Sequence, residues 1–243
     1  MSKIIAIIPA RYNSTRFPGK VLEKIGDKTI LELVYHKVRQ AKTIDEIIIA
    51  TDDQKIIEVA SSFGAHAEMT FSTHKSGTDR CAQVSREFWE DDIIINIQGD
   101  EPFIKPEIID SLALKMKDDN WIEIATLCTK IDIHSEISDP NTVKIVKDIY
   151  SKALYFSRST IPYYREKETE KLFFKHIGIY AYRNKILQSI TVLKESPLEK
   201  AEKLEQLRWM ENGYKIHAFE TEYDGFGIDT EEDLEKARKK YIS

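Results

Sequence analysis

Apolar and polar positions follow one another along the first half of the chain in blocks that predict strands and helices in turn. Short apolar blocks predict strands at residues 4–8, 46–50, 65–69 and 92–97. Apolar residues three and four positions apart predict helices at residues 29–41, 53–63 and 79–89, and Thr29 is placed to cap the first of them. Because strands and helices alternate, we expect an α/β, Rossmann-like fold with a mainly parallel wound sheet.

From Trp121 onward the alternation loosens. Strands are predicted at residues 124–127, 143–146 and 173–182, with polar connections at 132–141 and 166–171. One helix over 198–212, a strand over 215–219 and a last helix from Thr230, with Asp233 as its capping-box partner, complete the pattern. We therefore predict a single domain over residues 1–243, in which about 121–212 form a smaller, strand-rich insertion between about 1–120 and 213–243.

A loop with three cations follows the first strand, in the segment IIAIIPARYNSTRFPGK. Pro9 and Pro18-Gly19 predict that the strand ends there and the chain turns. Ligands of open α/β sheets bind at the carboxyl ends of strands, so Arg11, Arg16 and Lys20 face the expected pocket. These cations, with the hydroxyls of Ser14 and Thr15, suit a polyphosphate. The alternative is an exposed, solvated basic loop. The chain has no GxxxxGK[ST] and no GxGxxG after its first strand.

Two carboxylates stand in similar positions later in the chain. Asp100 follows the predicted strand at 92–97 in the segment NIQGDEP, and Asp229 lies in GIDT. Mg²⁺ prefers hard oxygen ligands and usually takes one or two carboxylates plus substrate phosphates, so the pair predicts a magnesium site. For Asp229 the competing interpretation is a helix cap, because Glu231 and further acidic residues follow it. The polar loop HKSGTDR, before the helix predicted at 79–89, fits a phosphate or base contact and a capped turn equally well.

Composition narrows the class of protein. Of the 243 residues, 42% are hydrophobic and 32% charged, as in globular proteins, and the net charge of −5 does not favour nucleic acid or an anionic membrane as partner. No segment reaches the apolar length that a membrane span needs, so we expect a cytoplasmic protein. Cys81 and Cys128 lie 47 positions apart without a further ligand pattern, which predicts two reduced, buried thiols.

Four further segments are ALYFSRSTIP, KHIGIY, SPLE and LEQLR. With IIAIIPARYNSTRFPGK, HKSGTDR, NIQGDEP and GIDT, they make the chain resemble the sugar-activating nucleotidyltransferases, and in particular the 3-deoxy-manno-octulosonate (Kdo) cytidylyltransferase family. The resemblance covers nearly the whole chain. Two departures are Val21, where the family commonly has proline, and the segment YDGF before Gly227. Read without the family, His176 and Tyr180 share one face of a strand and a structural histidine is favoured.

The resemblance implies a Mg²⁺-dependent transfer of CMP from CTP to the anomeric hydroxyl of Kdo in lipopolysaccharide biosynthesis. It also implies that the protein is a homodimer. It places catalysis on Arg11, Lys20, Asp100 and Asp229, with Asp100 and Asp229 as metal ligands. It implies nucleotide contacts from Ala10, Arg11, Ser14, Arg16, Lys20, Thr73, Ser76 and Gln98. It implies sugar contacts from Arg80, Gln98, Arg158, His176, Tyr180, Glu205 and Gln206.

The same resemblance assigns nucleotide binding to about residues 1–120 and 213–243, and sugar binding and dimerisation to about 121–212. Two alternatives stay open. The acceptor is 8-amino-Kdo or another acidic sugar, or the chain is a non-catalytic module that binds nucleotide sugars, since fold alone does not fix function. The retained carboxylate pair argues against the binding module, which needs the cations but not both metal ligands.

Overall fold

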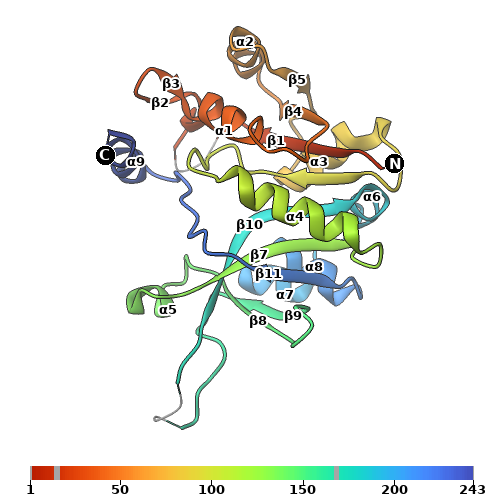
Figure 1. The fold of residues 1–243 in the computed structure, drawn as a ribbon, viewed down its shortest axis with the longest axis vertical. Helices are drawn as coiled ribbons and strands as arrows, with labels where there is room; N and C mark the ends of the chain where they lie inside the picture. The colour runs from red at the N-terminus through yellow and green to blue at the C-terminus, as the bar shows by residue number, and fades with distance from the viewer. Residues whose placement is uncertain (1, 14–16, 167–169, 243) are drawn as a thin grey trace.

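A computed structural model describes residues 2–13, 17–166 and 170–242. Within these residues nine strands form one sheet, whose main path runs in the order β11-β7-β10-β6-β1-β4-β5 (Figure 1). The first-half strands are β1 (Ile4–Ala10), β4 (Glu46–Thr51), β5 (His66–Met69) and β6 (Ile93–Asn96), all parallel. The sheet continues through β7 (Ile124–Lys130), β10 (Phe174–Arg183) and β11 (Ile216–Glu220). β10 is antiparallel to β6 and β7, and β11 is parallel to β7. The expected Rossmann-like α/β fold is confirmed.

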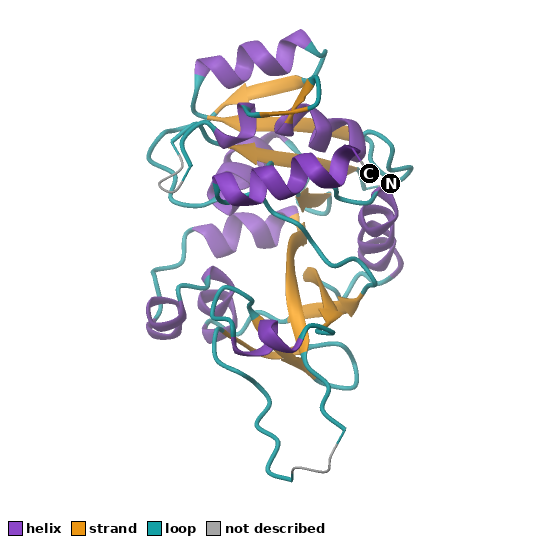
Figure 2. Ribbon diagram, turned by 90° about the vertical axis from the view of Figure 1, so that its left-hand side faces the viewer, coloured by secondary structure: helices purple, strands orange, loops and turns teal. Residues whose placement is uncertain are grey.

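Helices cover both faces of the sheet because successive side chains of β1 point to opposite sides. Ile4, Ala6 and Ile8 belong to one apolar core and Ile5 and Ile7 to another. The first core includes residues of α1 (Ile30–Val38), α2 (Gln54–Ser62) and α4 (Pro106–Asp118). The second includes residues of α3 (Gly77–Val84), α6 (Asn184–Thr191) and α8 (Glu205–Glu211). Figure 2 shows helices on both sides of the strands.

The strand-rich part is continuous with the wound sheet. β7 and β10 lie between β6 and β11, and the hairpin of β8 (Lys144–Lys147) and β9 (Ala153–Ser157) attaches to β10. The described parts of the connection between β9 and β10 project away from the body (Figures 1 and 2). A short helix, α5 (His134–Ser138), lies within the connection expected to be a polar loop.

After β11 the chain runs back along the molecule to α9 (Glu231–Ile242), beside the small hairpin of β2 (Lys24–Ile25) and β3 (Lys28–Thr29) (Figure 1). Ile25, Ile30, Ile228, Leu234 and Ala237 form the apolar cluster that seats this helix. No helix in the described part of the chain is long and apolar enough to cross a membrane. Both cysteines are buried free thiols, as predicted.

Several predicted element bounds need correction. β1 does not end at Ile8 but runs through Pro9 to Ala10. Pairing with β6 ends at Ile7, so Pro9, which has no N–H, does not interrupt the hydrogen bonds between β1 and β6. The helix predicted over 198–212 is two helices, α7 (Pro197–Glu202) and α8, because Lys203 adopts a left-handed conformation with φ of 53°. The helix predicted over 79–89 begins at Gly77 and ends at Val84, followed by a 3-10 turn at Ser85–Glu87.

Candidate active site

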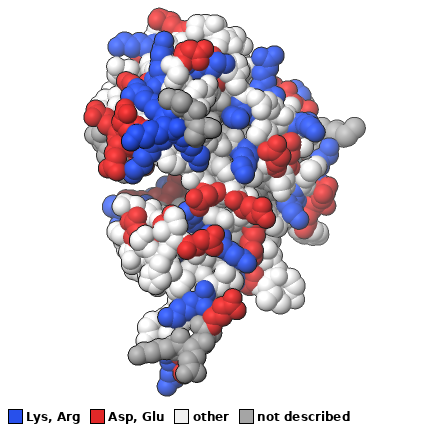
Figure 3. Space-filling model, turned by 60° about the vertical axis from the view of Figure 1, so that its left-hand side comes forward, with Lys and Arg blue, Asp and Glu red and all other residues white. Residues whose placement is uncertain are grey.

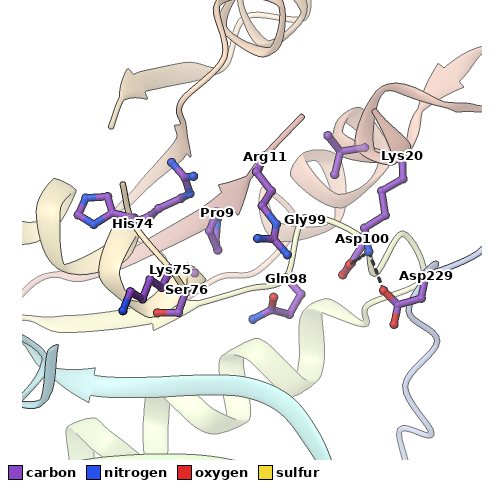
Figure 4. Close-up of a pocket in the computed structure, with 14 residues that line it drawn as sticks. Pro9, Arg11, Lys20, His74, Lys75, Ser76, Gln98, Gly99, Asp100 and Asp229 are labelled. Carbon is purple, nitrogen blue, oxygen red and sulfur yellow. Dashed lines mark hydrogen bonds and ion pairs between the residues drawn. The ribbon is translucent and has the colours of Figure 1, made fainter. Parts of the chain in front are cut away.

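The site lies where the strand order reverses. The chain goes from β1 to β4 and β5 on one side and then places β6 on the other side of β1, so the loops after β1 and β6 separate at the carboxyl edge of the sheet. A cavity of about 230 Å³ opens there (Figure 4). Its lining comes from the loops after β1 and β6, the loop before α3 and the segment before α9. It includes Ala10, Arg11, Lys20, Ser76, Arg80, Gln98, Asp100 and Asp229.

Lys20 joins the two carboxylates that the sequence singled out. Its Nζ lies 2.5 Å from Oδ2 of Asp100 and 2.8 Å from Oδ1 of Asp229, although 209 positions separate Lys20 from Asp229. A backbone bond from Ile228 N–H to the Asp100 carbonyl (3.0 Å) ties the two carboxylate segments together. The structure therefore brings together three of the four predicted catalytic residues in one ion-pair cluster, and the fourth, Arg11, lines the same cavity (Figure 4).

The alternative of an exposed, solvated basic loop does not hold for Lys20, which is only 9% exposed. Arg11 is exposed and also lines the cavity, as expected. Gly19 has φ of 74° and its N–H donates to the Tyr12 carbonyl at 2.7 Å, and this turn directs Lys20 inward at the start of a 3-10 helix. Ser14 and Arg16 lie outside the described residues, so their predicted nucleotide contacts stay predictions.

Electrostatics at this end of the cavity favour a cation. Burial alone would lower the pKa of Lys20, but the charges and hydrogen bonds of Asp100 and Asp229 outweigh burial and raise it. Next to them, burial raises the pKa of Glu101 to about 7, assisted by the charge of Asp100, and the Tyr223 hydroxyl donates to Glu101 at 3.3 Å. Sequence reasoning did not select Glu101 or Tyr223, although Glu101 belongs to the quoted segment NIQGDEP and Tyr223 to the departure YDGF.

The carboxylate pair fits a divalent metal. Among the described residues no group of three or more His, Cys, Asp and Glu side chains could hold a metal ion. Two carboxylates can hold Mg²⁺ when substrate phosphates and water complete its ligand shell. The ammonium of Lys20 already lies between the two carboxylates, which shows that the pair accommodates positive charge.

A helix cap is supplied by Thr230 rather than by the Asp229 side chain. The Thr230 hydroxyl accepts from Asp233 N–H at 3.2 Å, and the Asp233 carboxylate accepts from Thr230 N–H at 3.0 Å. This is the capping box predicted from the sequence. The Asp229 carboxylate points instead to Lys20 (Figure 4). The cap of α9 therefore comes from Thr230 and Asp233, and the metal-ligand role of Asp229 stays a prediction.

Glycine is required where the loop after β6 approaches the end of β1. A Cβ on Gly99 would lie 2.9 Å from the Pro9 carbonyl oxygen, closer than side chains tolerate. Gln98, the residue before it, donates from Nε2 to the Asn96 side chain and the Gly178 carbonyl, both at 3.4 Å. Gln98 therefore connects the loop after β6 to β10.

The loop before α3 closes the other end of the cavity and is both a capped turn and a cavity wall. Ser76 caps α3 in a capping box with Asp79, and its hydroxyl also donates to Glu205 Oε1 at 3.1 Å. His74 is fixed by Gln83 at 2.6 Å. A second cavity of about 730 Å³ lies beyond this loop and shares His74, Lys75 and Ser76 with the first. Thr73 and Glu205 line it.

Several of the predicted sugar-binding side chains form hydrogen bonds or ion pairs with other residues of the protein. Glu205 also accepts from Thr78 at 2.7 Å and from Arg208 at 2.7 Å. Arg80 is buried in an ion pair with Asp52 at 2.6 Å. Arg158 donates to the carbonyls of Glu202 (2.7 Å) and Pro140 (2.8 Å) and lines neither of the two cavities. These side chains have structural partners, and their sugar contacts stay predictions.

His176, Tyr180 and Gln206 line neither of the two cavities. Burial lowers the pKa of His176 to about 3, so its imidazole is neutral near pH 7, and its Nε2 lies 2.9 Å from the Thr126 hydroxyl. The rings of His176 and Tyr180 are in contact, with centroids 5.2 Å apart. Tyr180 and Gln206 are buried. The shared face of His176 and Tyr180 on β10 is confirmed, and their roles toward a sugar stay predictions.

The charge distribution around the site is uneven. On the face shown in Figure 3, Lys and Arg side chains gather above a hollow, and Asp and Glu side chains gather below it. Such a distribution favours an anionic ligand in the upper part of the hollow.

Comparison with known proteins gives a consistent picture. Residues 5–216 match the family model described as Cytidylyltransferase. The 3-deoxy-manno-octulosonate cytidylyltransferase of Solibacter usitatus is 48% identical over 240 residues, which cover 98% of this chain and 94% of that protein. That of Cytophaga hutchinsonii is 50% identical over 238 residues, which cover 95% and 94%.

Solved structures agree. A CMP:2-keto-3-deoxy-manno-octonic acid synthetase complexed with CTP superimposes with a TM-score of 0.94 at 44% identity, covering 99% of each chain. A 4-diphosphocytidyl-2C-methyl-D-erythritol synthase from Anaerococcus prevotii, with a TM-score of 0.68 and 17% identity, shares the fold.

The fold and the site together define a nucleotidyltransferase of the cytidylyltransferase class, whose members are generally metal-dependent. Within that class, the chain belongs to the 3-deoxy-manno-octulosonate cytidylyltransferase family.

Proposed function

We propose that the protein transfers CMP from CTP to the anomeric hydroxyl of Kdo and releases pyrophosphate, which activates this sugar for lipopolysaccharide biosynthesis. The observation that carries the proposal is the cluster of Lys20, Asp100 and Asp229 at the switch point of the sheet, in one cavity with Arg11. Family membership and the CTP complex of the similar synthetase support it.

In the proposed reaction the sugar hydroxyl attacks the α-phosphorus of CTP, and the bond to the pyrophosphate oxygen breaks. Such transfers depend on positioning and on neutralising charge that develops on the phosphate oxygens. Arg11 and Lys20 hold the β- and γ-phosphates and the departing pyrophosphate. Asp100 and Asp229 would hold Mg²⁺, which when bound would polarise the α-phosphate and lower the pKa of the attacking hydroxyl. Ser76 and Gln98 face the cytidine and the reacting centre.

The sugar is proposed to enter from the side of β10 and α8, where His176, Tyr180, Glu205 and Gln206 lie. Arg80 and Arg158 complete the predicted set. Because His176 is neutral near pH 7, its part in holding an acidic sugar is a hydrogen bond rather than an ion pair. Thr73, with Ala10, completes the predicted nucleotide set.

We also propose that the enzyme works as a cytoplasmic homodimer that joins through the strand-rich part. Large apolar side chains are exposed there around the β8–β9 hairpin, namely Ile149, Tyr150, Leu154 and Tyr163. Large exposed apolar side chains are a feature of interaction surfaces. Light scattering behind size exclusion checks the mass, and Tyr150→Asp with Ile149→Asp should convert a dimer into monomers.

The test of the activity is pyrophosphate release from the purified protein with CTP, Mg²⁺ and a panel of sugar acids. We expect turnover with CTP and Kdo and little with other nucleoside triphosphates. Much faster turnover with 8-amino-Kdo would replace the acceptor and leave the reaction type intact. Tight binding of CTP with no turnover for any acid would instead favour the non-catalytic binding module.

A further inference from the structure

The ammonium of Lys20 occupies the position between the two carboxylates at which the cofactor is expected. Nζ contacts one oxygen from each carboxylate, at 2.5 Å and 2.8 Å. The Lys20 side chain is 11% exposed, whereas those of Asp100 and Asp229 are 23% and 47% exposed. Solvent and ligands therefore reach the carboxylates more easily than they reach the lysine.

We propose that Lys20 is a resident cation that offsets part of the negative charge of the carboxylate pair before substrate binds, and that the triphosphate of CTP draws it away so that the metal can take its place. This inference rests on the proposed function, since it takes CTP as the anion. Its new element is that one residue controls metal affinity and nucleotide affinity with opposite signs.

Two physical arguments carry the proposal. A divalent ion ligated by both carboxylates would lie beside the Lys20 ammonium and be repelled by its charge, so lysine and metal compete. Lysine holds its charge on a flexible four-carbon stem, so its head can exchange a carboxylate for a phosphate oxygen while its backbone stays fixed. The backbone is fixed here by the 3-10 helix at Lys20–Leu22 and by the turn at Gly19.

The cavity places the alternative acceptor within the same space. Arg11 lines it between Lys20 at one end and Ser76 at the other, as Figure 4 shows. A triphosphate that lies along this line meets Arg11 and brings its oxygens to Lys20. The metal-free, nucleotide-free protein should therefore bind divalent ions weakly, and the ion should bind together with CTP.

The test measures Mn²⁺ binding by electron paramagnetic resonance to the protein without nucleotide. Lys20→Met should bind Mn²⁺ about tenfold more tightly than the unmodified protein, because a competing charge is gone. The same variant, in EDTA, should bind CTP about tenfold more weakly by calorimetry. Lys185→Met is the matched control, because Lys185 is an exposed lysine of α6 that lines neither cavity, and both affinities should change less than about twofold.

Lys20→Gln provides a second variant that keeps a hydrogen-bond donor next to the carboxylates if the methionine variant folds poorly. It should also gain Mn²⁺ affinity, and a further Asp229→Asn change should remove that gain. Equal or weaker Mn²⁺ binding in both Lys20 variants would overturn the proposal, as would an equal gain in Lys185→Met. These results are independent of turnover, so they are distinguishable from a failure of CTP and Kdo to react.

Discussion

Two ends of the site differ in what their charged side chains are bonded to: the end at which a metal is proposed, called the metal end, and the predicted sugar end. At the metal end, Lys20 and the two carboxylates bond to one another and line a cavity. At the sugar end, Glu205 accepts from Ser76 and Thr78, which begin α3, and from Arg208. The first group can exchange partners for a ligand by moving one side chain. In the second, the same exchange would remove bonds that hold α3 against α8.

The comparison teaches that a shared family motif does not give every residue the same kind of role. Asp100 and Asp229 have geometry that suits direct ligation. Glu205 accepts hydrogen bonds from Ser76 and Thr78, so it is suited to hold the loop before α3 in place, whether or not it also contacts the acceptor. Three changes separate these roles.

The largest effect is expected for Asp229→Asn. Removing one of two metal-binding charges should lower Mg²⁺-dependent pyrophosphate release by about 10²–10³-fold. The fold should persist, because Thr230 and Asp233 cap α9. Thr230→Ala is the matched control. It should lower stability by about 1 kcal/mol, or roughly 2–4 °C in thermal midpoint, and leave turnover nearly unchanged. Full activity of Asp229→Asn would remove this residue from the metal site.

A smaller effect is expected for Glu205→Ala. If Glu205 positions the loop before α3, the change should weaken CTP binding by about tenfold as well as raise the KM for the sugar. Arg158→Ala, which touches neither Ser76 nor Thr78, should raise the sugar KM alone. Glu202→Ala is a control on α7, because Glu202 bonds to Ser157 and Arg158. Unchanged CTP affinity in Glu205→Ala, measured by titration, would assign this residue to the acceptor only.

The smallest effect is a pH dependence of stability that belongs to the sugar end. Burial lowers the pKa of His176 from 6.5 to about 3, so the unfolded chain takes up a proton that the folded protein does not. The stability that follows from this is present above pH 6.5 and is lost as the pH falls toward 3. Between pH 7 and pH 5 the loss should be roughly 1–2 kcal/mol.

His176→Gln should flatten that part of the stability curve, as measured by urea unfolding at each pH. His134→Gln, at an exposed position on α5, serves as control and should leave the slope as it is. An equal slope in the His176 variant would show that folding leaves the pKa of His176 unchanged.

The metal end could be anticipated from the sequence because its residues follow parallel strands. Arg11 comes after β1 and Asp100 after β6, and neighbouring parallel strands bring such loops together without knowledge of other contacts. Asp229 was harder, because its local pattern fits a helix start, and only the family resemblance favoured ligation. The partners of Glu205 could not be predicted, because they lie 127 and 129 positions away and depend on how α8 packs against α3.

Some elements went unpredicted for local reasons. α4 is not among the predicted elements, although Pro106 at its start and apolar residues at helical spacing, including Ile109, Leu112 and Met116, are typical of a helix. The predictions also lack α6 and β9. The break at Lys203 carries no such signal, because a lysine with positive φ is uncommon and is imposed by the packing of α7 and α8.

The position of Asp229 in the chain has a consequence for synthesis. β1 and β6 are made early, so the cation loop and Asp100 leave the ribosome long before the second carboxylate. A chain shortened before residue 229 would keep Lys20 and Asp100 but lack the second predicted metal-binding carboxylate. If Asp229 holds the metal as proposed, a competent site requires the segment between β11 (Ile216–Glu220) and α9 (Glu231–Ile242), which is made last.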